Sequence, residues 1–314
     1  MFYHKEHQVN TDKERHVDTS KERQEKSDQS YYQDTKYRRD GKTNQSLLPE
    51  QQMQLTNQAL PFAKTKRGHV LNALPDLPDF RDKLYIPTLV DVPETRTLKE
   101  YISAKVPLLD QGQEGACTGF ALATVVNYLL RTRKVEPRTV RASPDMLYAL
   151  AKRYDEWSGE NYDGSSARGA MKGWHKHGVC ESVVWKKHTR LAPDVVSNAA
   201  NQPLGAYFRV NQKDLVAMHS AISETGILYA TASVHAGWDE PDEKGYIPYR
   251  RVKDGGHAFA IIGYDERGFW IQNSWGVDWG YKGSVCKGFC WCWIVGGSVG
   301  CGKRRPRQRS ERQS

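Results

Sequence analysis

Residues 110–130 read DQGQEGACTGFALATVVNYLL, and this stretch decides the fold of the chain. A glycine-rich loop leads into an apolar run from Phe120 to Leu130, which predicts a helix buried on nearly every side. Cys117 stands where the loop becomes the helix. The unpaired amides and the dipole of a helix N-terminus would lower its thiol pKa and favour a nucleophilic thiolate. An arbitrary cysteine is more often a small buried apolar residue, so this interpretation requires a base and an orienting partner.

A second stretch supplies such partners. Residues 255–276 read GGHAFAIIGYDERGFWIQNSWG, in which strand-like segments at 257–264 and 269–275 flank a turn and predict a hairpin. His257 opens one strand and Asn273 comes near the end of the other, so the two side chains would meet across neighbouring strands. An Asn carbonyl oxygen that accepts one imidazole N–H would fix the tautomer and point the other nitrogen toward a thiol.

Other local signals give the order of the elements. Ser143, Pro144 and Asp145 begin a helix that runs to about residue 154, and a further helix begins at Ser165 or Ser166 and stops at residue 178. Strand-like periodicity then appears at 206–210 and 226–234. Helices followed by strands predict an α+β fold with two lobes.

Together the two quoted stretches resemble the papain-like cysteine peptidases. Gln111 stands six residues before Cys117, as the oxyanion-hole glutamine of that family stands before its nucleophile. His257 follows Cys117 by about 140 residues, near the roughly 130 to 150 of the family. The string from Asn273 to Gly276, NSWG, also matches, and the likeness covers about residues 93–283. The resemblance implies a papain-like fold in which a helical lobe and a β-barrel-like lobe enclose an active-site cleft.

The resemblance also implies the roles of individual residues in a cysteine endopeptidase. Cys117 would be the nucleophile, His257 the acid and base, Asn273 the orienting group, and Gln111 part of the oxyanion hole. Three further positions, Gly164, Ser165 and Gly256, would bind extended substrate, and Trp275 would cover the bond between the imidazole and the asparagine. The expected partner is a peptide or protein substrate, the expected state a monomer, and no metal or cofactor is expected.

Two other functions fit the same residues. A Cys-His-Asn triad also suits acyl transfer or deamidation, as in a transglutaminase, because these reactions differ in the acceptor rather than in the nucleophile. A non-catalytic binding protein that keeps a papain-like fold is the other alternative. The sequence leaves all three open.

The chain departs from the family where a disulfide normally braces the nucleophile. Glu114 replaces one cysteine, and no partner cysteine occurs around residues 163–166. The first residues, MFYHKEHQ, carry charge where a secretory signal would be apolar. Both features favour a reducing, cytoplasmic location, with export by a route that needs no signal as the alternative. The apolar run at 120–130 is too short to span a membrane, so none is expected as a partner.

The amino-acid composition differs between the N-terminal segment and the rest of the chain. Of its 314 residues only 38% are hydrophobic and the mean hydropathy is -0.73. A polar segment with few apolar residues cannot offset its ordering entropy, so residues 1–66 are predicted to be a disordered arm rather than a folded propeptide. The predicted order continues with an extended, proline-punctuated strap at 67–107, a helical lobe at 108–205, a β lobe at 206–285 and an atypical tail at 286–314.

The tail is rich in cysteine and basic at its end. Four of the six cysteines follow residue 285, but their spacing lacks a C-x-x-C pair and a histidine, so no zinc site is expected. Most of the net charge of +9 belongs to the last dozen residues, and nucleic acid is not expected as a partner beyond that basic end. We interpret the tail as a truncated or frame-shifted replacement for the final strands, with residues 289–295, FCWCWIV, used as a strand.

Overall fold

The computed structural model divides the chain into two units, residues 1–58 and 59–314, and all described residues belong to the second. The structure describes residues 63–76, 79–88, 91–133, 140–156, 163–186, 190–252, 254–280, 284–288 and 297–301. Within these ranges, no helix combines the length and the apolar character that a membrane span requires. Residues 1–62 of the arm predicted at 1–66 lie outside the described residues, as do the predicted strand FCWCWIV at 289–295 and the basic end at 303–314. Residues 63–66 are described, and Ala63–Lys64 form a β-strand there rather than a disordered segment.

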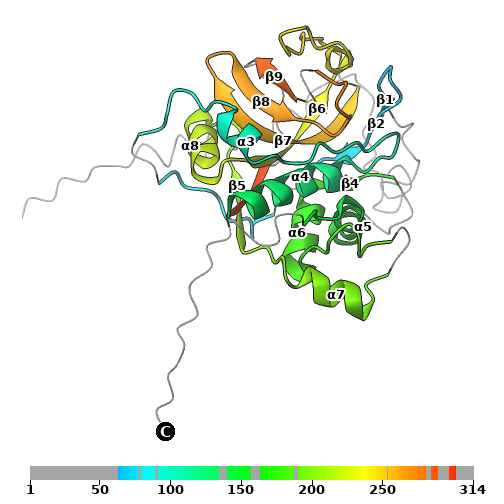
Figure 1. Cartoon of the computed structure of the whole chain (residues 1–314). Helices are drawn as coiled ribbons and strands as arrows, with labels where there is room; N and C mark the ends of the chain where they lie inside the picture. The colour runs from blue at the N-terminus through cyan, green and yellow to red at the C-terminus, as the bar shows by residue number, and fades with distance from the viewer. Residues whose placement is uncertain are drawn as a thin grey trace, which may run out of the picture. The chain divides into compact units, whose positions relative to one another are not determined.

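The helical part is built around α4 (Cys117–Thr132), which is buried along most of its length as its sequence predicts. Helix α5 (Pro144–Tyr154) begins as predicted, because the Ser143 hydroxyl accepts the N–H of Met146 and Pro144 occupies the first turn. Helices α4 and α5 pack closely, since a Cβ on Gly119 would lie 2.3 Å from the Pro144 carbonyl oxygen. Figure 1 shows α5 and α6 lying beside α4.

Helix α6 (Ala167–His177) also begins and ends where the sequence predicts. The Ser166 hydroxyl caps its first turn by accepting the N–H of Gly169, and Gly178 ends it with a positive φ of 73°. Two shorter helices were not predicted: α3 (Lys99–Ser103) and α7 (Pro193–Ala199). A proline at the first turn and Asp194 beside it were the sequence signal for α7.

The β part is a six-stranded sheet with the order β5-β10-β6-β7-β8-β9. Its strands are β5 (Ala206–Val210), β6 (Leu228–Val234), β7 (Gly255–Asp265), β8 (Gly268–Gln272), β9 (Ser284–Gly288) and β10 (Gly297–Cys301). The predicted hairpin is confirmed, since β7 and β8 pair antiparallel, although β8 ends before residue 275. Among the described strands, β5 and β9 each pair with one neighbour, so the sheet is open rather than closed into the expected barrel.

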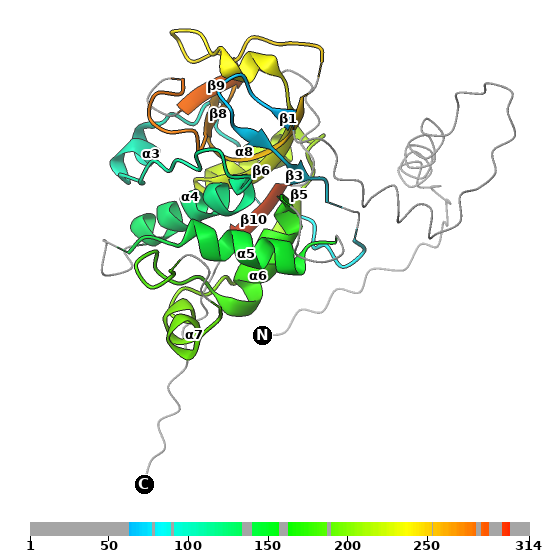
Figure 2. The same cartoon turned by 90° about the vertical axis from the view of Figure 1, so that its right-hand side faces the viewer.

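Strand β7 is buried on both of its faces. Ala258, Ala260 and Ile262 pack in one core cluster with residues of α4, whereas Phe259 and Ile261 pack in another with residues of α8 (Leu215–Thr225). Figure 2 shows α4 lying between the strands and the helices α5 and α6. The sequence analysis missed α8, although Asp214 caps its start and Gly226 ends it in the left-handed conformation.

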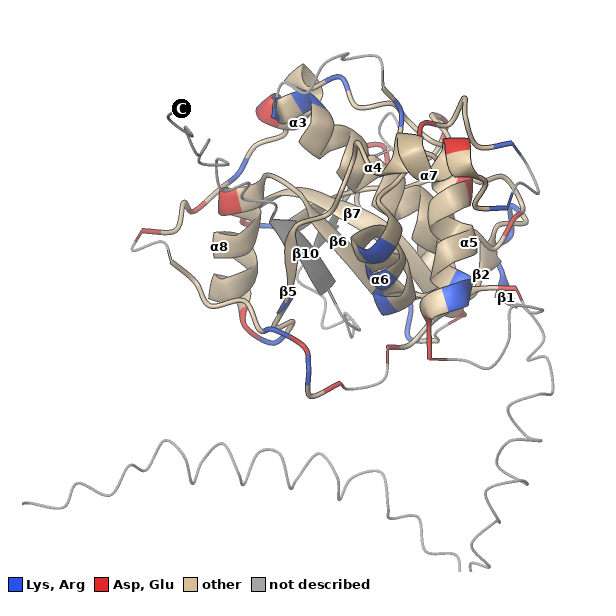
Figure 3. Cartoon of the chain, turned by 90° about the horizontal axis from the view of Figure 1, so that it is seen from below, with Lys and Arg blue, Asp and Glu red and all other residues tan. Residues whose placement is uncertain are grey.

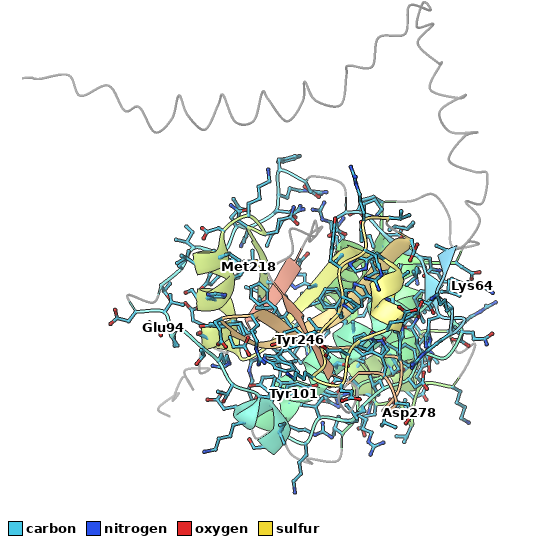
Figure 4. The ribbon with its side chains drawn as sticks, turned by 90° about the horizontal axis from the view of Figure 1, so that it is seen from above. Lys64, Glu94, Tyr101, Met218, Tyr246 and Asp278 are labelled. Carbon is cyan, nitrogen blue, oxygen red and sulfur yellow. The ribbon has the colours of Figure 1, made fainter. Side chains whose placement is uncertain are left out.

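Before the helices, an extended strap crosses this unit. It begins with a hairpin of β1 (Ala63–Lys64) and β2 (Val70–Leu71) and continues into β3 (Ala73–Leu74). Lys64 and Glu94, labelled at opposite sides of Figure 4, mark how far the strap extends. Its later part pairs with the sheet edge, where the Tyr85 N–H donates to the Arg209 carbonyl oxygen at 2.8 Å.

Charged side chains hold the middle of the strap. The Arg168 guanidinium of α6, which is only 5% exposed, contacts Asp82 at 2.5 Å and Asp79 at 3.8 Å. Its backbone N–H also donates to Asp76 Oδ1 at 2.8 Å. Blue and red segments, which mark basic and acidic residues, are interspersed along the ribbon in Figure 3.

Candidate active site

Cys117 is the first residue of α4, and its side chain is fully buried. The backbone N–H groups of Cys117 and Thr118 at the start of the helix lower its thiol pKa, as the sequence analysis expected. Complete burial outweighs them and raises the thiol pKa to about 11. The predicted lowering is therefore wrong for this conformation, in which the thiol is neutral at pH 7.

The hairpin of β7 and β8 brings His257 and Asn273 together. The His257 Nε2 and the Asn273 Oδ1 lie 2.7 Å apart, and the same oxygen accepts the Ser274 N–H at 2.8 Å. Because this oxygen is the acceptor in both contacts, Nε2 carries the imidazole proton and Nδ1 presents a lone pair. Among the described residues, the buried Nδ1 finds no hydrogen-bond partner.

Burial also keeps the imidazole neutral. It lowers the pKa of His257 to about 4, although the bond to Asn273 acts in the opposite direction and His69 adds a further lowering by charge repulsion. The Cys117 thiol lies within hydrogen-bonding reach of the backbone N–H of Ala258, the residue that follows His257 in β7. The fold thus brings Cys117 against the strand that carries His257. In this conformation the thiol and the imidazole are both uncharged.

Tryptophan side chains surround the imidazole. The Trp275 ring lies 4.8 Å from the His257 ring between centroids, and Trp238 approaches His257 edge-on at 6.1 Å. Trp279 stacks on Trp238 at 6.1 Å and donates its Nε1–H to the Trp238 carbonyl oxygen. Trp275 was predicted at this position, whereas Trp238 was not, because its only signal in the sequence was a lone tryptophan between two strands.

Gln111 is held in place by both ends of its side-chain amide. Its Nε2 donates to the Glu114 carbonyl oxygen at 2.8 Å, and its Oε1 accepts the Ser274 hydroxyl at 2.7 Å. The backbone N–H of Gln111 also donates to the Ser274 carbonyl oxygen at 2.9 Å. Ser274 was quoted from the sequence without a role, and the structure shows that it orients this amide.

The strap covers the thiol. The backbone N–H of Ala73 in β3 comes close enough to the Cys117 thiol to lower its pKa, although burial outweighs this effect. On one side Ala73 pairs in parallel with Ser165 of β4 (Ser165–Ser166), and on the other Asn72 forms a bridge with Gly256. Gly164 also faces the strap, since a Cβ there would lie 2.4 Å from the Asn72 carbonyl oxygen.

The three residues predicted to bind substrate, Gly164, Ser165 and Gly256, are therefore brought together around Cys117. In this structure they hold residues 72–74 of the same chain. No local signal predicted this arrangement, because the strap and its partners lie far apart along the chain.

Comparison with known proteins agrees with this geometry. The family described as papain family cysteine protease matches residues 92–287, which is more than half of the chain. The chain belongs to the papain family of cysteine proteases. The predicted papain-like α+β fold and the cysteine peptidase class are thereby confirmed.

Individual members of the papain family are distant in sequence. Cathepsin B-like CP2 of Giardia intestinalis is 25% identical over 208 residues, which cover 62% of this chain and 68% of that protein. The structure of xylellain, a cysteine protease from Xylella fastidiosa, matches with a TM-score of 0.65 and 24% identity, covering 77% of this chain and 98% of that one. Digestive procathepsin L 3 of Tenebrio molitor matches with a TM-score of 0.55 and 16% identity, covering 90% and 89%.

Both cysteines whose side chains are described, Cys117 and Cys180, are free and buried. Glu114 stands near Cys117 where the family pattern has a cysteine, as the sequence showed. In the described part of the chain, no group of three or more histidine, cysteine or acidic side chains forms a metal site.

Proposed function

We propose that this papain-family protein hydrolyses peptide bonds through Cys117, His257 and Asn273, with Gln111 in the oxyanion hole. The observation that carries the proposal is the bond between His257 Nε2 and Asn273 Oδ1, because it leaves Nδ1 as a base on the strand that contacts the thiol. The substrate class we infer is a peptide or protein in an extended conformation.

The reaction follows from the positions of these groups. Nδ1 of His257 takes the thiol proton of Cys117, and the sulfur attacks the carbonyl carbon of the substrate. The developing oxyanion accepts hydrogen bonds from the Cys117 N–H and from Nε2 of Gln111. His257 then protonates the leaving amine, and it afterwards takes a proton from the water that hydrolyses the thioester.

The covered conformation is inactive in this proposal. Residues 72–74 occupy the space beside the sulfur, and the buried pair is neutral. When the strap moves away, water and substrate reach both groups and the desolvation that opposes their charged forms falls. The helix N-terminus and the imidazole then favour the thiolate, so uncovering the site also activates the nucleophile.

Hydrolysis of a peptide library under reducing conditions tests the proposal. Full-length protein and the full-length Asn72→Ala variant, which loosens the strap, are compared by mass spectrometry of the products. We expect cleavage that the Cys117→Ala substitution abolishes. Cleavage that persists in Cys117→Ala would assign the activity to other residues.

Two further measurements separate the proposal from its alternatives. A primary amine added to the reaction would appear in the products if the enzyme transferred the acyl group rather than hydrolysing it. A thiol-directed epoxide should label Cys117 stoichiometrically in the Asn72→Ala protein and more slowly when His257→Ala is added. Rapid labelling without cleavage of any peptide would instead indicate a binding protein.

A further inference from the structure

The side chain of Asn72 fills a slot between two glycines beside the nucleophile. Asn72 is only 8% exposed. A Cβ on Gly115 would lie 1.9 Å from a terminal atom of its side-chain amide, and a Cβ on Gly164 would lie 3.2 Å from its Cγ. Gly164 has a φ of 104°, a conformation that disfavours other residues. Side chains at positions 115 and 164 would therefore close the slot.

Two backbone groups in the slot are complementary to a primary carboxamide. The amide of Asn72 satisfies both groups when its nitrogen faces Gly115. In that orientation the nitrogen donates to the Gly115 carbonyl oxygen at 3.0 Å, and the amide oxygen accepts the Gly164 N–H at 3.0 Å. The Gly164 N–H also donates to the Tyr148 hydroxyl at 2.9 Å, so it is shared between two acceptors. The slot thus offers one acceptor and one donor on opposite sides of a planar amide.

The slot lies next to the bond-breaking position. Asn72 immediately precedes Ala73, whose N–H approaches the Cys117 sulfur, and its own backbone forms a bridge with Gly256. Gly256 directly precedes His257. A peptide that replaced the strap would therefore place the side chain of a residue beside its reactive carbonyl in this slot.

We propose that the slot between Gly115 and Gly164 recognises the carboxamide of an asparagine in the substrate, next to the bond that is cleaved. This inference rests on the proposed function, which it deepens by naming the substrate class. An aspartate in the slot cannot donate to the Gly115 carbonyl oxygen. A leucine cannot donate to that oxygen either, and it leaves the Gly164 N–H with only the Tyr148 hydroxyl as its acceptor. We expect a preference for asparagine of about tenfold to a hundredfold over either residue.

A protection experiment tests the slot without requiring turnover. The full-length Asn72→Ala variant leaves the slot empty of its own side chain. Three capped peptides of the sequence of residues 70–75, with asparagine, aspartate or leucine at the third position, are added before iodoacetamide. The rate of Cys117 alkylation then measures how well each peptide covers the thiol.

The asparagine peptide should protect Cys117 at a concentration about tenfold to a hundredfold lower than the other two. Equal protection by the three peptides would overturn the proposal. Asn201→Ala, a matched substitution at an exposed position, should retain the slow alkylation of the wild type. If Asn72→Ala does not fold, Asn72→Asp serves the same purpose, because its carboxylate cannot donate to Gly115.

Cleavage of a peptide library separates this proposal from the proposed function. Cleavage without enrichment of asparagine beside the cut bond would overturn the slot while the peptidase assignment stood. Selective protection by the asparagine peptide without any cleavage would support the slot and contradict the peptidase assignment. Gly115→Ala should abolish the difference between the asparagine and leucine peptides in the protection assay, because its Cβ occupies the slot.

Discussion

The Ser274 hydroxyl donates a hydrogen bond to Oε1 of Gln111 at 2.7 Å, so a residue next to Asn273 orients the side chain proposed for the oxyanion hole. The two residues are 163 positions apart in the chain. A backbone bond from the Gln111 N–H to the Ser274 carbonyl oxygen reinforces the contact. The end of β8 therefore positions the imidazole partner and the oxyanion donor together.

Replacing Ser274 with alanine should lower kcat by about tenfold and leave KM nearly unchanged. Without the hydroxyl, Oε1 of Gln111 loses a buried partner and the amide can rotate away from the developing oxyanion. Steady-state kinetics of the uncovered enzyme measures the effect, and Ser182→Ala, far from the site, is the control. A rise in KM at constant kcat would indicate a role in ground-state binding instead.

Replacing Asn273 with aspartate should raise the pKa of His257 from about 4, because an anion at 2.7 Å from Nε2 stabilises the imidazolium. NMR titration of the His257 ring in the full-length protein measures this shift. Asn273→Ala should not raise the pKa, since it removes the hydrogen bond without adding a charge. An unchanged pKa in Asn273→Asp would mean that the imidazole has left its partner.

Replacing Arg168 with methionine should loosen the strap. The buried guanidinium contacts Asp79, Asp82 and Glu156, and its loss leaves these carboxylates without that compensation. Removing one partner of a buried ion pair costs about 3 to 5 kcal/mol. We expect a lower free energy of unfolding and faster alkylation of Cys117.

The control for this experiment is Arg81→Met. Arg81 pairs with Asp79 at 2.7 Å, but its side chain is 71% exposed, so its loss should lower the free energy of unfolding far less than the loss of Arg168. Equal effects of the two substitutions would mean that burial of the ion pair does not hold the strap.

The stability of the covered conformation should fall as the pH rises through about 6. Burial raises the pKa of Asp76 to about 6, although the Arg168 N–H and the charges of Arg168 and Arg209 act in the opposite direction and Glu156 adds to the rise. A carboxyl group with a raised pKa contributes most stability below its unfolded pKa of about 3.9 and loses it as it ionises.

The rise in the pKa of Asp76 sets the size of this loss of stability. It corresponds to about 3 kcal/mol in the free energy of unfolding between pH 4 and pH 8. Denaturant unfolding at several pH values measures it. Asp76→Asn keeps an acceptor for the Arg168 N–H but cannot ionise, so it should remove this component of the pH dependence. The same slope in both proteins would assign the effect to other groups.

Local sequence signals predicted the parts of the site that depend on neighbouring residues. The loop before Cys117 and the apolar run after it predicted α4, and the turn at 265–268 predicted the hairpin that joins His257 to Asn273. Caps at Ser143 and Ser166 gave the starts of two helices. These features follow from hydrogen bonds and periodicity within a few residues.

The strap over the nucleophile could not be predicted in the same way. The segment 72–74 is short and shows no distinctive sequence pattern. Only the fold brings its partners at positions 115, 164 and 256 to it. The prediction of a lowered pKa for the Cys117 thiol was wrong for the same reason. A helix N-terminus is visible in the sequence, whereas the burial that reverses its effect comes from distant segments.

The position of β10 bears on the synthesis of the protein. In the sheet, β10 lies between β5 and β6, and its backbone pairs with both. When the nascent chain has left the ribosome only as far as β9, strands β6 to β9 can pair with one another. Strand β5 cannot yet join them, because β10, which lies between β5 and β6, is still missing. Release of residues 297–301 from the exit tunnel is therefore the event that lets this edge of the sheet assemble.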